Sequence, residues 1–551
     1  MIMNKKPIRI LFLLVLMLAV MTACSSKDSK EAGGNDASLA AKASEETEKS
    51  AADYDANLIA KAKTGQFVGL EKAGIISFKG IPYAEPPVGA LRWHEPVSCQ
   101  PSDKIIEAYQ YGLAAIQPQW HTEEASSFPQ GEDCLTLNIW TKSLEPDKAK
   151  PVMVWIHGGA LGWGGTVDPL YDGRNFVQRR DDVVLVSINY RVGILGFMDL
   201  SRFGEEYKNS SNLGLLDQVA ALQWVRDNIE AFGGDPDNVT IFGESSGGAS
   251  VALLLTTESA KGLFDKAIIQ SGSAGYQSAQ ATGSENSNEI TEMLLKNAEA
   301  DTIEDLLNLS EEELVALSYE ITGNDYLNSA TRDGTFIPKD PWQVLIDGGV
   351  STGVPLLVGC NADEDKYNIL EAKSYEVFEE WTLGGWEDES AQMTDEELTI
   401  ADKYFSRRSG LSKVEQITAL GTEAGERARA IKMAEYHSKN APTYMYYWNI
   451  PSSFENVGAC HAVELAYVLY NLDEDIFTGK PIDAGIAGKV QDAWVNFAVN
   501  GNPSTDTAEW PKYDTENRST MVISADKWYV EDDPLSEDRI LVEPLFKKYK
   551  D

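Results

Sequence analysis

Cysteine, histidine and basic side chains are all scarce in this chain of 551 residues. Its five cysteines are too few for a disulfide-stapled scaffold, and they form no zinc-type cluster with the five histidines. The sequence also lacks a P-loop and a G-x-G-x-x-G fingerprint, two common signatures of nucleotide binding. We therefore expect no metal and no organic cofactor.

Basic residues are outnumbered by acidic ones. The chain has 47 Lys and Arg against 86 Asp and Glu, which gives a formal charge of −39. Nucleic acid is excluded as a partner, because phosphate binding needs clustered cations and an acidic surface repels a polyanion. Hydrophobic residues make up 43% of the chain, which is enough for a large packed core. No feature of the sequence indicates an obligate protein partner.

Long apolar runs are also missing, apart from one near the N-terminus. Three basic residues precede about 12 apolar residues at positions 10–21, too few to cross a bilayer of ~30 Å as a lasting helix. The small residues directly before Cys24 resemble the lipobox of bacterial lipoproteins. Residues 1–23 are thus predicted to be a signal peptide, with Cys24 as the lipidated first residue of an exported protein. It would be anchored in the cell membrane and face outside the cytoplasm. The alternative is an ordinary cleaved signal with an incidental cysteine.

The segment after the signal has the composition of a flexible tether. Residues 24–55 are rich in Ser, Ala, Gly, Lys and Glu and contain almost no large apolar side chain, and we expect one folded domain over residues 56–551. Loss of the signal removes three basic residues and lowers the formal charge to −42. A body this acidic is expected to be repelled by an anionic bilayer and to extend from it on the tether.

Strands alternate with helices over the rest of the chain. Short β-branched runs without polar alternation predict central strands of a mainly parallel sheet, at residues 152–156, 183–188, 239–242, 267–270, 355–358 and 443–448. The clearest amphipathic helix is predicted over residues 213–232, with Asn212 as its N-cap and Gly233 and Gly234 as its stop. This pattern predicts a twisted α/β sheet with helices on both faces.

Two acidic, helical stretches interrupt this alternation, at residues 277–329 and 368–429. Insertions of this length in an α/β enzyme commonly cover or border the active site.

A serine nucleophile can be placed by its context. The pattern G-x-S-x-G occurs around Ser245 and again around Ser351. The chemistry requires a sharp strand-to-helix turn that lifts the hydroxyl clear of the backbone. Residues 238–242 read as a strand and residues 248–255 as a helix, so Ser245 has that context. Ser351 precedes a strand instead, and we interpret it as a loop serine.

The base that activates such a serine is usually a histidine that follows it in the chain. Only His437 and His461 follow Ser245. His437 ends a charged amphipathic helix, where an exposed histidine favours the helix dipole and needs no further role. His461 stands in a glycine-containing loop that opens a helix, which is typical of a catalytic histidine.

The remaining parts are an acid and an oxyanion hole. Three carboxylates, Asp363, Glu364 and Asp365, follow a predicted strand, and spacing alone does not choose among them as the group that orients the histidine. The small-residue loop of Gly158, Gly159 and Ala160 follows another strand and can present backbone N–H groups to a negative oxygen.

The chain resembles the type B carboxylesterase/lipase family, the cholinesterase-like branch of the α/β-hydrolases. The resemblance extends from Gly65 to Pro511 and rests on ordered motifs. They are Phe78-Lys-Gly-Ile-Pro-Tyr-Ala84, Glu132-Asp-Cys-Leu135, Asn189-Tyr-Arg191, Asn212-Leu-Gly-Leu-Leu-Asp-Gln218, Phe232-Gly-Gly-Asp-Pro236 and Gly243-Glu-Ser-Ser-Gly-Gly248.

The resemblance implies an α/β-hydrolase fold and a serine esterase that acts on small-molecule carboxylic esters. Matched position by position, it makes Ser245 the nucleophile, His461 the general base and Glu364 the orienting acid. Gly159, Ala160 and Ser246 are the implied oxyanion-hole donors. Ser246 replaces the family's usual Ala, and Asp365 replaces a Gly, which adds a like charge beside Glu364.

Two other functions stay open at this stage. A catalytically silent member of the fold can serve in adhesion or binding, although such a role does not require an intact serine, histidine and acid. A thioesterase or peptidase on the same fold is the nearer alternative, because acyl-enzyme chemistry does not choose its leaving group.

Cysteines and aromatic residues leave further alternatives. Cys134 occupies a family position whose usual partner is absent, and a Cys99–Cys134 bridge is permitted in an exported chain. Cys360 and Cys460 can meet or can be buried small hydrophobes, and we favour the second reading. Candidates for an apolar substrate pocket are Trp120, Trp163, Tyr367, Trp381 and Trp386.

Overall fold

The computed structural model describes residues 50–118, 128–145, 149–275, 291–321, 330–350, 352–372 and 374–546. The predicted signal, Cys24, most of the predicted tether, Trp120 and Ser351 lie outside these ranges. The chain from Ser50 onward forms one compact unit. Within the described ranges, each helix is too short or too polar to cross a membrane.

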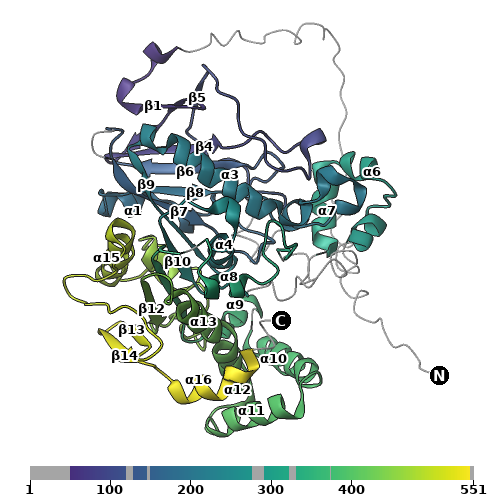
Figure 1. The fold of residues 1–551 in the computed structure, drawn as a ribbon, viewed down its shortest axis with the longest axis vertical. Coiled ribbons are helices and arrows are strands. Elements are labelled where there is room, and N and C mark those ends of the chain that lie inside the picture. The colour runs from purple at the N-terminus through teal and green to yellow at the C-terminus, as the bar shows by residue number, and fades with distance from the viewer. Residues whose placement is uncertain are drawn as a thin grey trace, which may run out of the picture. The chain divides into compact units, whose positions relative to one another are not determined.

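The main sheet of the described chain has eleven strands in the order β14-β13-β12-β11-β10-β9-β7-β8-β6-β4-β3 (Figure 1). The seven strands from β13 to β8 in this order run parallel to one another. They are β7 (Lys150–Ile156), β8 (Val184–Ile188), β9 (Gly234–Glu244), β10 (Lys266–Gln270), β11 (Leu356–Asn361), β12 (Thr443–Trp448) and β13 (Ser519–Ile523). All six predicted strands belong to this parallel region, which confirms the mainly parallel sheet.

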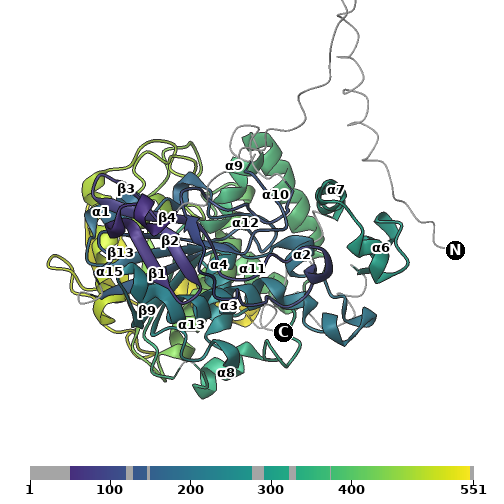
Figure 2. The ribbon, with the colours of Figure 1, turned by 90° about the horizontal axis from the view of Figure 1, so that it is seen from above.

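Both edges of the main sheet are antiparallel. One edge is built by β3 (Leu70–Lys72), β4 (Ile75–Pro82) and β6 (Thr136–Thr141), and the other by β14 (Trp528–Asp532). A small second sheet is formed by β1 (Ile59–Ala62), β2 (Gly65–Val68) and β5 (Ile105–Glu107), and β1 and β2 stand out in Figure 2. Residues 50–55, assigned to the tether above, include Tyr54, whose hydroxyl donates to Glu107 at 2.8 Å.

The sheet separates two apolar cores. Along β7, Val154 packs into one core and its neighbours Met153 and Trp155 into the other, as expected for a strand buried on both faces. Helices on the first face include α3 (Leu213–Asn228), α4 (Ser246–Leu254), α8 (Pro341–Asp347) and α13 (Ala428–His437). Those on the second include α1 (Arg174–Arg179), α14 (Leu465–Val468) and α15 (Ala484–Asn500). The predicted helices on both faces are confirmed.

The predicted helix over residues 213–232 is present as α3, followed by a 3₁₀ turn to Phe232. Gly233 ends it in the left-handed conformation, with φ 81°. Asn212 is the N-cap residue, as predicted, although its side chain makes no capping hydrogen bond. Its amide instead bonds the backbone N–H and C=O of Thr331, each at 2.9 Å, and thereby fixes a distant loop.

Both acidic stretches are helical where the structure describes them. The first contains α6 (Ile303–Leu307) and α7 (Glu311–Ile321), which pack with α2 (Gly193–Gly196) in a separate apolar cluster. The second contains α9 (Asn368–Ala372), α10 (Tyr375–Ser390), α11 (Asp395–Ser406) and α12 (Lys413–Thr422). Helix α11 packs against α16 (Ser536–Val542) far along the chain.

A buried ion pair ties the end of β8 to α3. The guanidinium of Arg191 donates to both carboxylate oxygens of Asp217, at 2.8 and 2.7 Å, and its backbone N–H donates to the same carboxylate at 3.0 Å. Both side chains are almost fully excluded from solvent.

We expect Asp217→Asn to lower the free energy of unfolding by about 3–5 kcal/mol, because it leaves the Arg191 charge buried without its partner. The matched control is Asp181→Asn, which breaks an exposed pair with Lys142 and should cost about 1 kcal/mol or less. Urea unfolding followed by tryptophan fluorescence measures both. Equal losses in the two variants would contradict a structural role for the buried pair.

Candidate active site

Ser245 sits on the turn between β9 and α4. Its backbone has φ 57° and ψ −125°, a conformation that side-chain-bearing residues rarely adopt. The strain is held by neighbouring hydrogen bonds: the Ser245 N–H donates to the Gln270 carbonyl at 2.9 Å, and the Ser245 carbonyl accepts from Ala249 N–H at 2.8 Å. The strand-to-helix turn expected around this serine is therefore present.

Two glycines make this turn possible. A Cβ at Gly247 would overlap the carbonyl oxygen of Ile156 on β7, and one at Gly243 would lie 2.5 Å from the backbone of Gly247. The start of α4 thus packs directly on the ends of β7 and β9, with no room for side chains. This close approach explains the glycines on either side of the serine.

His461 is held by Glu364. The His461 Nδ1 lies 2.6 Å from Glu364 Oε2, and the His461 N–H donates to the Glu364 carbonyl at 3.3 Å. The other carboxylate oxygen of Glu364 accepts from Asn361 N–H at 2.6 Å and from the Ser271 hydroxyl at 2.7 Å. A carboxylate on Nδ1 keeps the proton there and leaves Nε2 as the basic nitrogen.

The two neighbouring carboxylates point elsewhere. Asp363 accepts from Ala459 N–H at 3.0 Å and pairs with Lys366 at 2.7 Å. Asp365 lies beside Glu426, and burial together with that carboxylate raises the pKa of Asp365 to about 7. Of the three carboxylates that spacing left open, the structure brings Glu364 to His461.

His437 differs from the expectation for an exposed helix-end residue. It is buried, and its Nε2 lies 2.7 Å from the Val354 carbonyl. Burial lowers the pKa of His437, so the ring is neutral at neutral pH and does not act through the helix dipole. It remains a structural histidine, but for a different reason than the sequence suggested.

A second layer of buried polar groups supports Glu364 and Ser245. The side-chain amide of Gln270 has two partners. Its nitrogen donates to Glu464 Oε1 at 3.0 Å, and its oxygen Oε1 accepts from the Trp494 indole N–H at 3.1 Å. The other Glu464 oxygen accepts from Asn361 at 2.6 Å. The sequence patterns did not single out Gln270, Asn361 or Ser271. All three end or follow predicted strands of the parallel sheet, which was the available signal.

The loop after β7 comes beside the serine. Gly159 and Ala160 have φ 109° and 51°, and a Cβ at Gly158 would lie 3.3 Å from the Cβ of Ser245. His157, which opens the loop, is buried and stacked on Tyr190 with ring centroids 4.3 Å apart. Burial lowers the pKa of His157 to about 4, so this ring is a neutral support for the loop.

These elements surround a cavity of about 690 Å³. Ser245, His461, Gly159 and Ala160 line it, whereas Glu364 and Ser246 lie behind the lining. Among the aromatic candidates, Trp163 and Tyr367 also line it.

Trp381 and Trp386 are not cavity residues. Trp381 is 52% exposed, and Trp386 packs on Phe405 with ring centroids 5.2 Å apart. From the acidic stretches, only Asn368 and Glu371 on α9 line the cavity within the described ranges. Both acidic stretches were expected to border the active site. Among their described residues, only helix α9, at the start of the stretch 368–429, does so.

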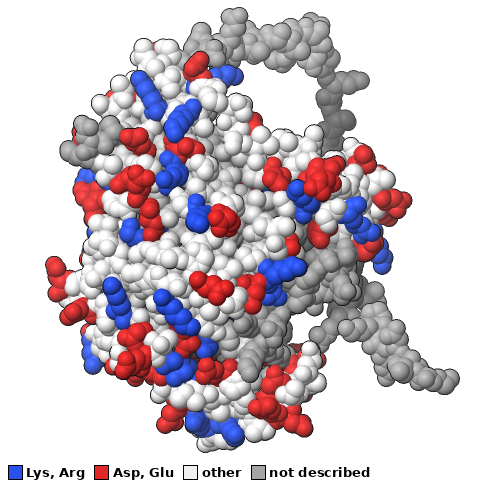
Figure 3. All heavy atoms as spheres, viewed as in Figure 1, with Lys and Arg blue, Asp and Glu red and all other residues white. Residues whose placement is uncertain are grey.

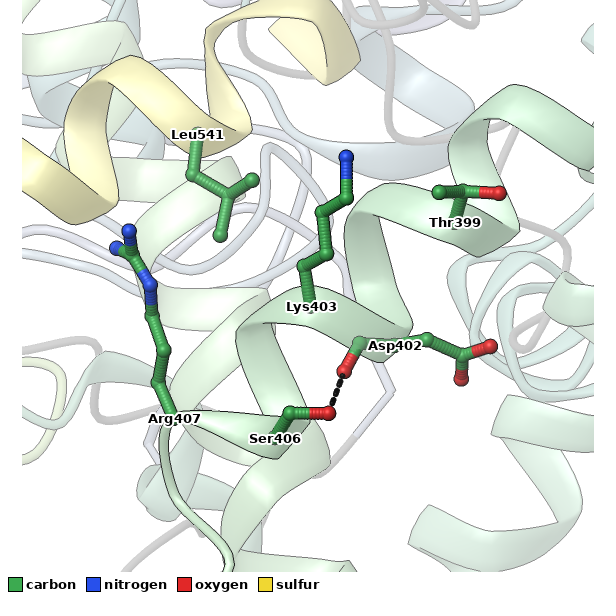
Figure 4. A pocket seen from close by; sticks show the side chains of 6 residues that line it. All are labelled: Thr399, Asp402, Lys403, Ser406, Arg407 and Leu541. Carbon is green, nitrogen blue, oxygen red and sulfur yellow. Dashed lines mark hydrogen bonds between the residues drawn. The ribbon is translucent and has the colours of Figure 1, made fainter.

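A second hollow of about 390 Å³ lies between α11 and α16 (Figure 4). Its one serine, Ser406, donates its hydroxyl to the Asp402 carbonyl at 2.7 Å, and the lining includes no histidine. Arg407 pairs with Asp538 at 3.1 Å. This hollow therefore offers no serine–histidine pair.

The four cysteines in the described ranges are free thiols, and Cys134, Cys360 and Cys460 are buried. The permitted Cys99–Cys134 bridge is therefore not formed. Burial raises the pKa of each of these three thiols, which suits small hydrophobic packing groups and agrees with the favoured reading of Cys360 and Cys460.

Glu244 is a buried carboxyl that faces the other side of His461. Its Oε1 lies 3.1 Å from His461 Nε2, and its side chain is 4% exposed. Burial, with the nearby carboxylates of Glu464 and Glu364, raises the pKa of Glu244 to about 8. At neutral pH the group is therefore mostly a neutral acid beside the basic nitrogen.

A serine on a strained strand-to-helix turn, with a carboxylate-held histidine over the carboxyl ends of a parallel sheet, defines a serine hydrolase of the α/β-hydrolase fold. Comparison with known proteins narrows the class. The model of the carboxylesterase family matches residues 56–538, and the chain belongs to that family. It is accordingly a carboxylic ester hydrolase.

Related proteins cover nearly the same length. The chain is 36% identical over 500 residues to the para-nitrobenzyl esterase of Bacillus subtilis, covering 87% of this chain and 97% of the relative. It is 34% identical over 497 residues to the medium-chain fatty acyl-CoA hydrolase precursor of Anas platyrhynchos, covering 80% and 83%. A solved carboxylesterase of Geobacillus stearothermophilus superposes with a TM-score of 0.76 at 33% identity, covering 88% of this chain and 99% of that one.

The titration of Glu244 predicts a pH-dependent stability. Because its folded pKa of about 8 lies above the ordinary 4.5, its contribution to stability is present at low pH and is lost as pH rises from about 4.5 through 8. Glu244→Gln copies the neutral acid without titrating. We expect its melting temperature relative to the natural protein to rise between pH 5 and pH 9, because each unit of the pKa shift is worth about 1.4 kcal/mol of unfolding free energy.

Glu206→Gln, at an exposed position, is the control and should show no such trend. A difference between Glu244→Gln and the natural protein that stays constant with pH would contradict the raised pKa of Glu244.

Proposed function

We propose that the chain hydrolyses small-molecule carboxylic esters with Ser245 as nucleophile, His461 as general base and acid, and Glu364 as the orienting acid. One observation carries this proposal: the 2.6 Å contact between His461 Nδ1 and Glu364 places an imidazole, with Nε2 as its base, in the cavity that holds the strained serine. Neither a buried structural histidine nor a surface serine would need this arrangement.

The first half of the reaction forms an acyl-enzyme. Ser245 Oγ attacks the ester carbonyl while His461 Nε2 takes its proton, and the Glu364 carboxylate stabilises the resulting imidazolium. The oxyanion is bound by the backbone N–H groups of Gly159, Ala160 and Ser246. Ser246 can fill this role as well as the family's usual Ala does, because only its backbone N–H, at the start of α4, binds the oxyanion. His461 then protonates the leaving alcohol.

The second half repeats these steps with water. His461 removes a proton from a water molecule that attacks the acyl carbonyl, and the proton returns to Ser245 as the acid product leaves. Glu244, neutral beside Nε2 at physiological pH, adds no negative charge next to the oxyanion. No step calls on a metal or an organic cofactor.

Thioester hydrolysis is the second candidate. It is favoured by the similarity to a protein named fatty acyl-CoA hydrolase, and the same acyl-enzyme accepts a thiol as leaving group. An adhesion or binding role without catalysis is disfavoured, because it would not need a serine, a histidine and an acid of this pattern, with His461 held by Glu364 and lining the same cavity as Ser245.

Hydrolysis of a series of p-nitrophenyl esters by the purified protein tests the catalytic assignment. We expect Ser245→Ala to lower kcat by about 10⁴-fold or more, since the nucleophile is lost. The matched control is Ser351→Ala, which removes the serine of the second G-x-S-x-G pattern and should leave turnover unchanged. Unchanged turnover in Ser245→Ala would contradict the assignment, and an inactive natural protein would favour the binding role.

We further propose that the protein is exported, lipidated at Cys24 after cleavage of residues 1–23, and held at the cell membrane outside the cytoplasm. The order of basic residues, short apolar run and small residues before Cys24 supports this location. The polar segment after Cys24 would let the acidic catalytic unit stand away from an anionic bilayer.

Labelling of a bacterial host with radioactive palmitate tests the anchor. We expect the full chain to carry the label and to sediment with membranes, and Cys24→Ser to lose both properties because the acylated thiol is gone. Cys99→Ser, which removes a thiol of the folded unit, is the control and should keep the label. A labelled or membrane-bound Cys24→Ser variant would contradict lipidation at this residue.

A further inference from the structure

The loop after β7 carries two of the three proposed oxyanion donors, Gly159 and Ala160. A short turn closes this loop, since the Gly159 carbonyl accepts the N–H groups of Gly162 and Trp163 at 2.9 and 3.0 Å. These bonds set the shape of the turn from within. Its far end, at Gly164, is held by a side chain from another part of the molecule.

The side-chain amide of Gln117 holds Gly164 at two points. Its oxygen accepts the Gly164 N–H at 2.7 Å, and its nitrogen donates to the Gly164 carbonyl at 2.8 Å. Paired residues of an antiparallel sheet exchange two hydrogen bonds in the same way. A third bond, from the same nitrogen to the Ala115 carbonyl at 2.9 Å, fixes the plane of the amide. Gln117 therefore sets both the position and the orientation of the peptide groups around Gly164.

Gln117 is itself anchored. It is buried, and its backbone N–H donates to the side-chain oxygen of Gln130 at 2.8 Å. Nearby, the Ala114 N–H donates to the Pro129 carbonyl at 2.9 Å, and the Ala114 carbonyl accepts the Gly131 N–H at 3.0 Å. The amide thus acts from a segment that has its own backbone partners, and it can hold the loop in a fixed place.

Close backbone contacts connect Gly164 with the start of the loop. A Cβ at Gly164 would lie 2.6 Å from the Gly158 carbonyl oxygen and 2.6 Å from His157 Nδ1. A Cβ at Gly159 would overlap the Trp163 carbonyl oxygen. The two ends of the loop therefore touch without side chains between them, and a displacement of Gly164 moves the donors as well.

Gln117 lines the cavity, but its amide is not a binding group for the substrate. A primary amide has two N–H bonds, and Gln117 uses both of them, on the carbonyls of Gly164 and Ala115. The amide is also neutral, unlike the acidic and basic side chains that Figure 3 shows interspersed over one face of the molecule. A neutral support adds no charge beside the developing oxyanion.

We propose that Gln117 is a positioning residue for the hydrolytic reaction. Its amide holds the loop after β7 so that Gly159 and Ala160 present their N–H groups where negative charge develops on the substrate oxygen. These N–H groups bind the transition state more strongly than the ester, so loss of the amide slows the chemical steps more than it weakens substrate binding. The inference rests on the proposed function and names the residue that holds its oxyanion hole in place.

Gln117→Met tests the proposal, because it removes the three bonds of the amide and keeps a side chain of similar length. For p-nitrophenyl butyrate we expect kcat to fall about 10- to 100-fold and KM to change by less than about threefold, since misplaced donors cost rate and not ground-state binding. Rates are expressed per active site, counted by the p-nitrophenol released when diethyl p-nitrophenyl phosphate phosphorylates Ser245. A misfolded fraction then leaves the measured kcat unchanged.

Gln117→Glu is the second variant. Its carboxylate keeps an acceptor for the Gly164 N–H but turns an oxygen, instead of a donor, toward the Gly164 carbonyl. It also brings a negative charge close to the oxyanion. We expect its kcat per active site to be lower than that of Gln117→Met, again with little change in KM.

A trifluoromethyl ketone gives an independent measurement, since it binds as a tetrahedral adduct of Ser245 with a negative oxygen. We expect its inhibition constant to rise by the same factor as kcat/KM falls, because the adduct uses the same N–H groups. The matched control is Gln416→Met. The Gln416 amide donates to the carbonyls of Arg408 and Leu411, at 3.0 and 3.1 Å, and lies outside the cavity lining. This control should leave kcat, KM and the inhibition constant unchanged.

The outcomes separate this inference from the proposed function. An unchanged kcat per active site in the Gln117 variants would overturn the positioning role, and so would a rise in KM at constant kcat, which would make Gln117 a substrate-binding residue. A lower kcat with unchanged affinity for the ketone would also overturn it, because the effect would not act through the oxyanion hole. Full activity of Ser245→Ala, or an inactive natural protein, would instead overturn the proposed function itself.

Discussion

The close packing of the first turn of α4 on the ends of β7, β9 and β10 is the constraint on which the rest of the site depends. Gly247 meets the Ile156 carbonyl, and the Ser245 N–H reaches the Gln270 carbonyl at 2.9 Å. This packing forces the serine into its strained conformation. It also fixes where the loop after β7 passes, and so which backbone N–H groups face the cavity. Strands distant in sequence thus act as one rigid support, as expected at the carboxyl ends of a parallel sheet.

The second organising feature is a set of buried carboxyl groups that differ in their hydrogen bonding. Glu364 receives donors on both oxygens and faces His461 Nδ1. Glu464 is bonded to Gln270 and Asn361, whereas Glu244 lies against the Nε2 side of His461. Burial raises the pKa of both Glu464 and Glu244. Glutamate thus serves here as an orienting acid, as a structural acceptor and as a neutral neighbour. The role of each depends on the hydrogen-bond donors around it.

The parallel sheet could be predicted because its strands are buried on both faces and read as continuous apolar runs. The edges could not, since β3 and β14 are largely exposed and have no such run. Within the site, motif context led to Ser245 and His461. Spacing could not choose Glu364 among three carboxylates, because only tertiary packing turns one of them to the imidazole. His437 was misread for the same reason: its burial depends on Val354, a residue far away in sequence.

Gln270 joins three parts of the molecule, since its carbonyl holds the serine turn, its amide holds Glu464 and its amide oxygen accepts from Trp494 on α15. Its side-chain amide donates to one partner and accepts from another, and few side chains of similar size can do both at once. This arrangement limits how such an enzyme can change over evolution. The walls of the cavity can be exchanged residue by residue to suit new esters, whereas Gln270 and the tryptophan behind it form a fixed point around which those changes must occur.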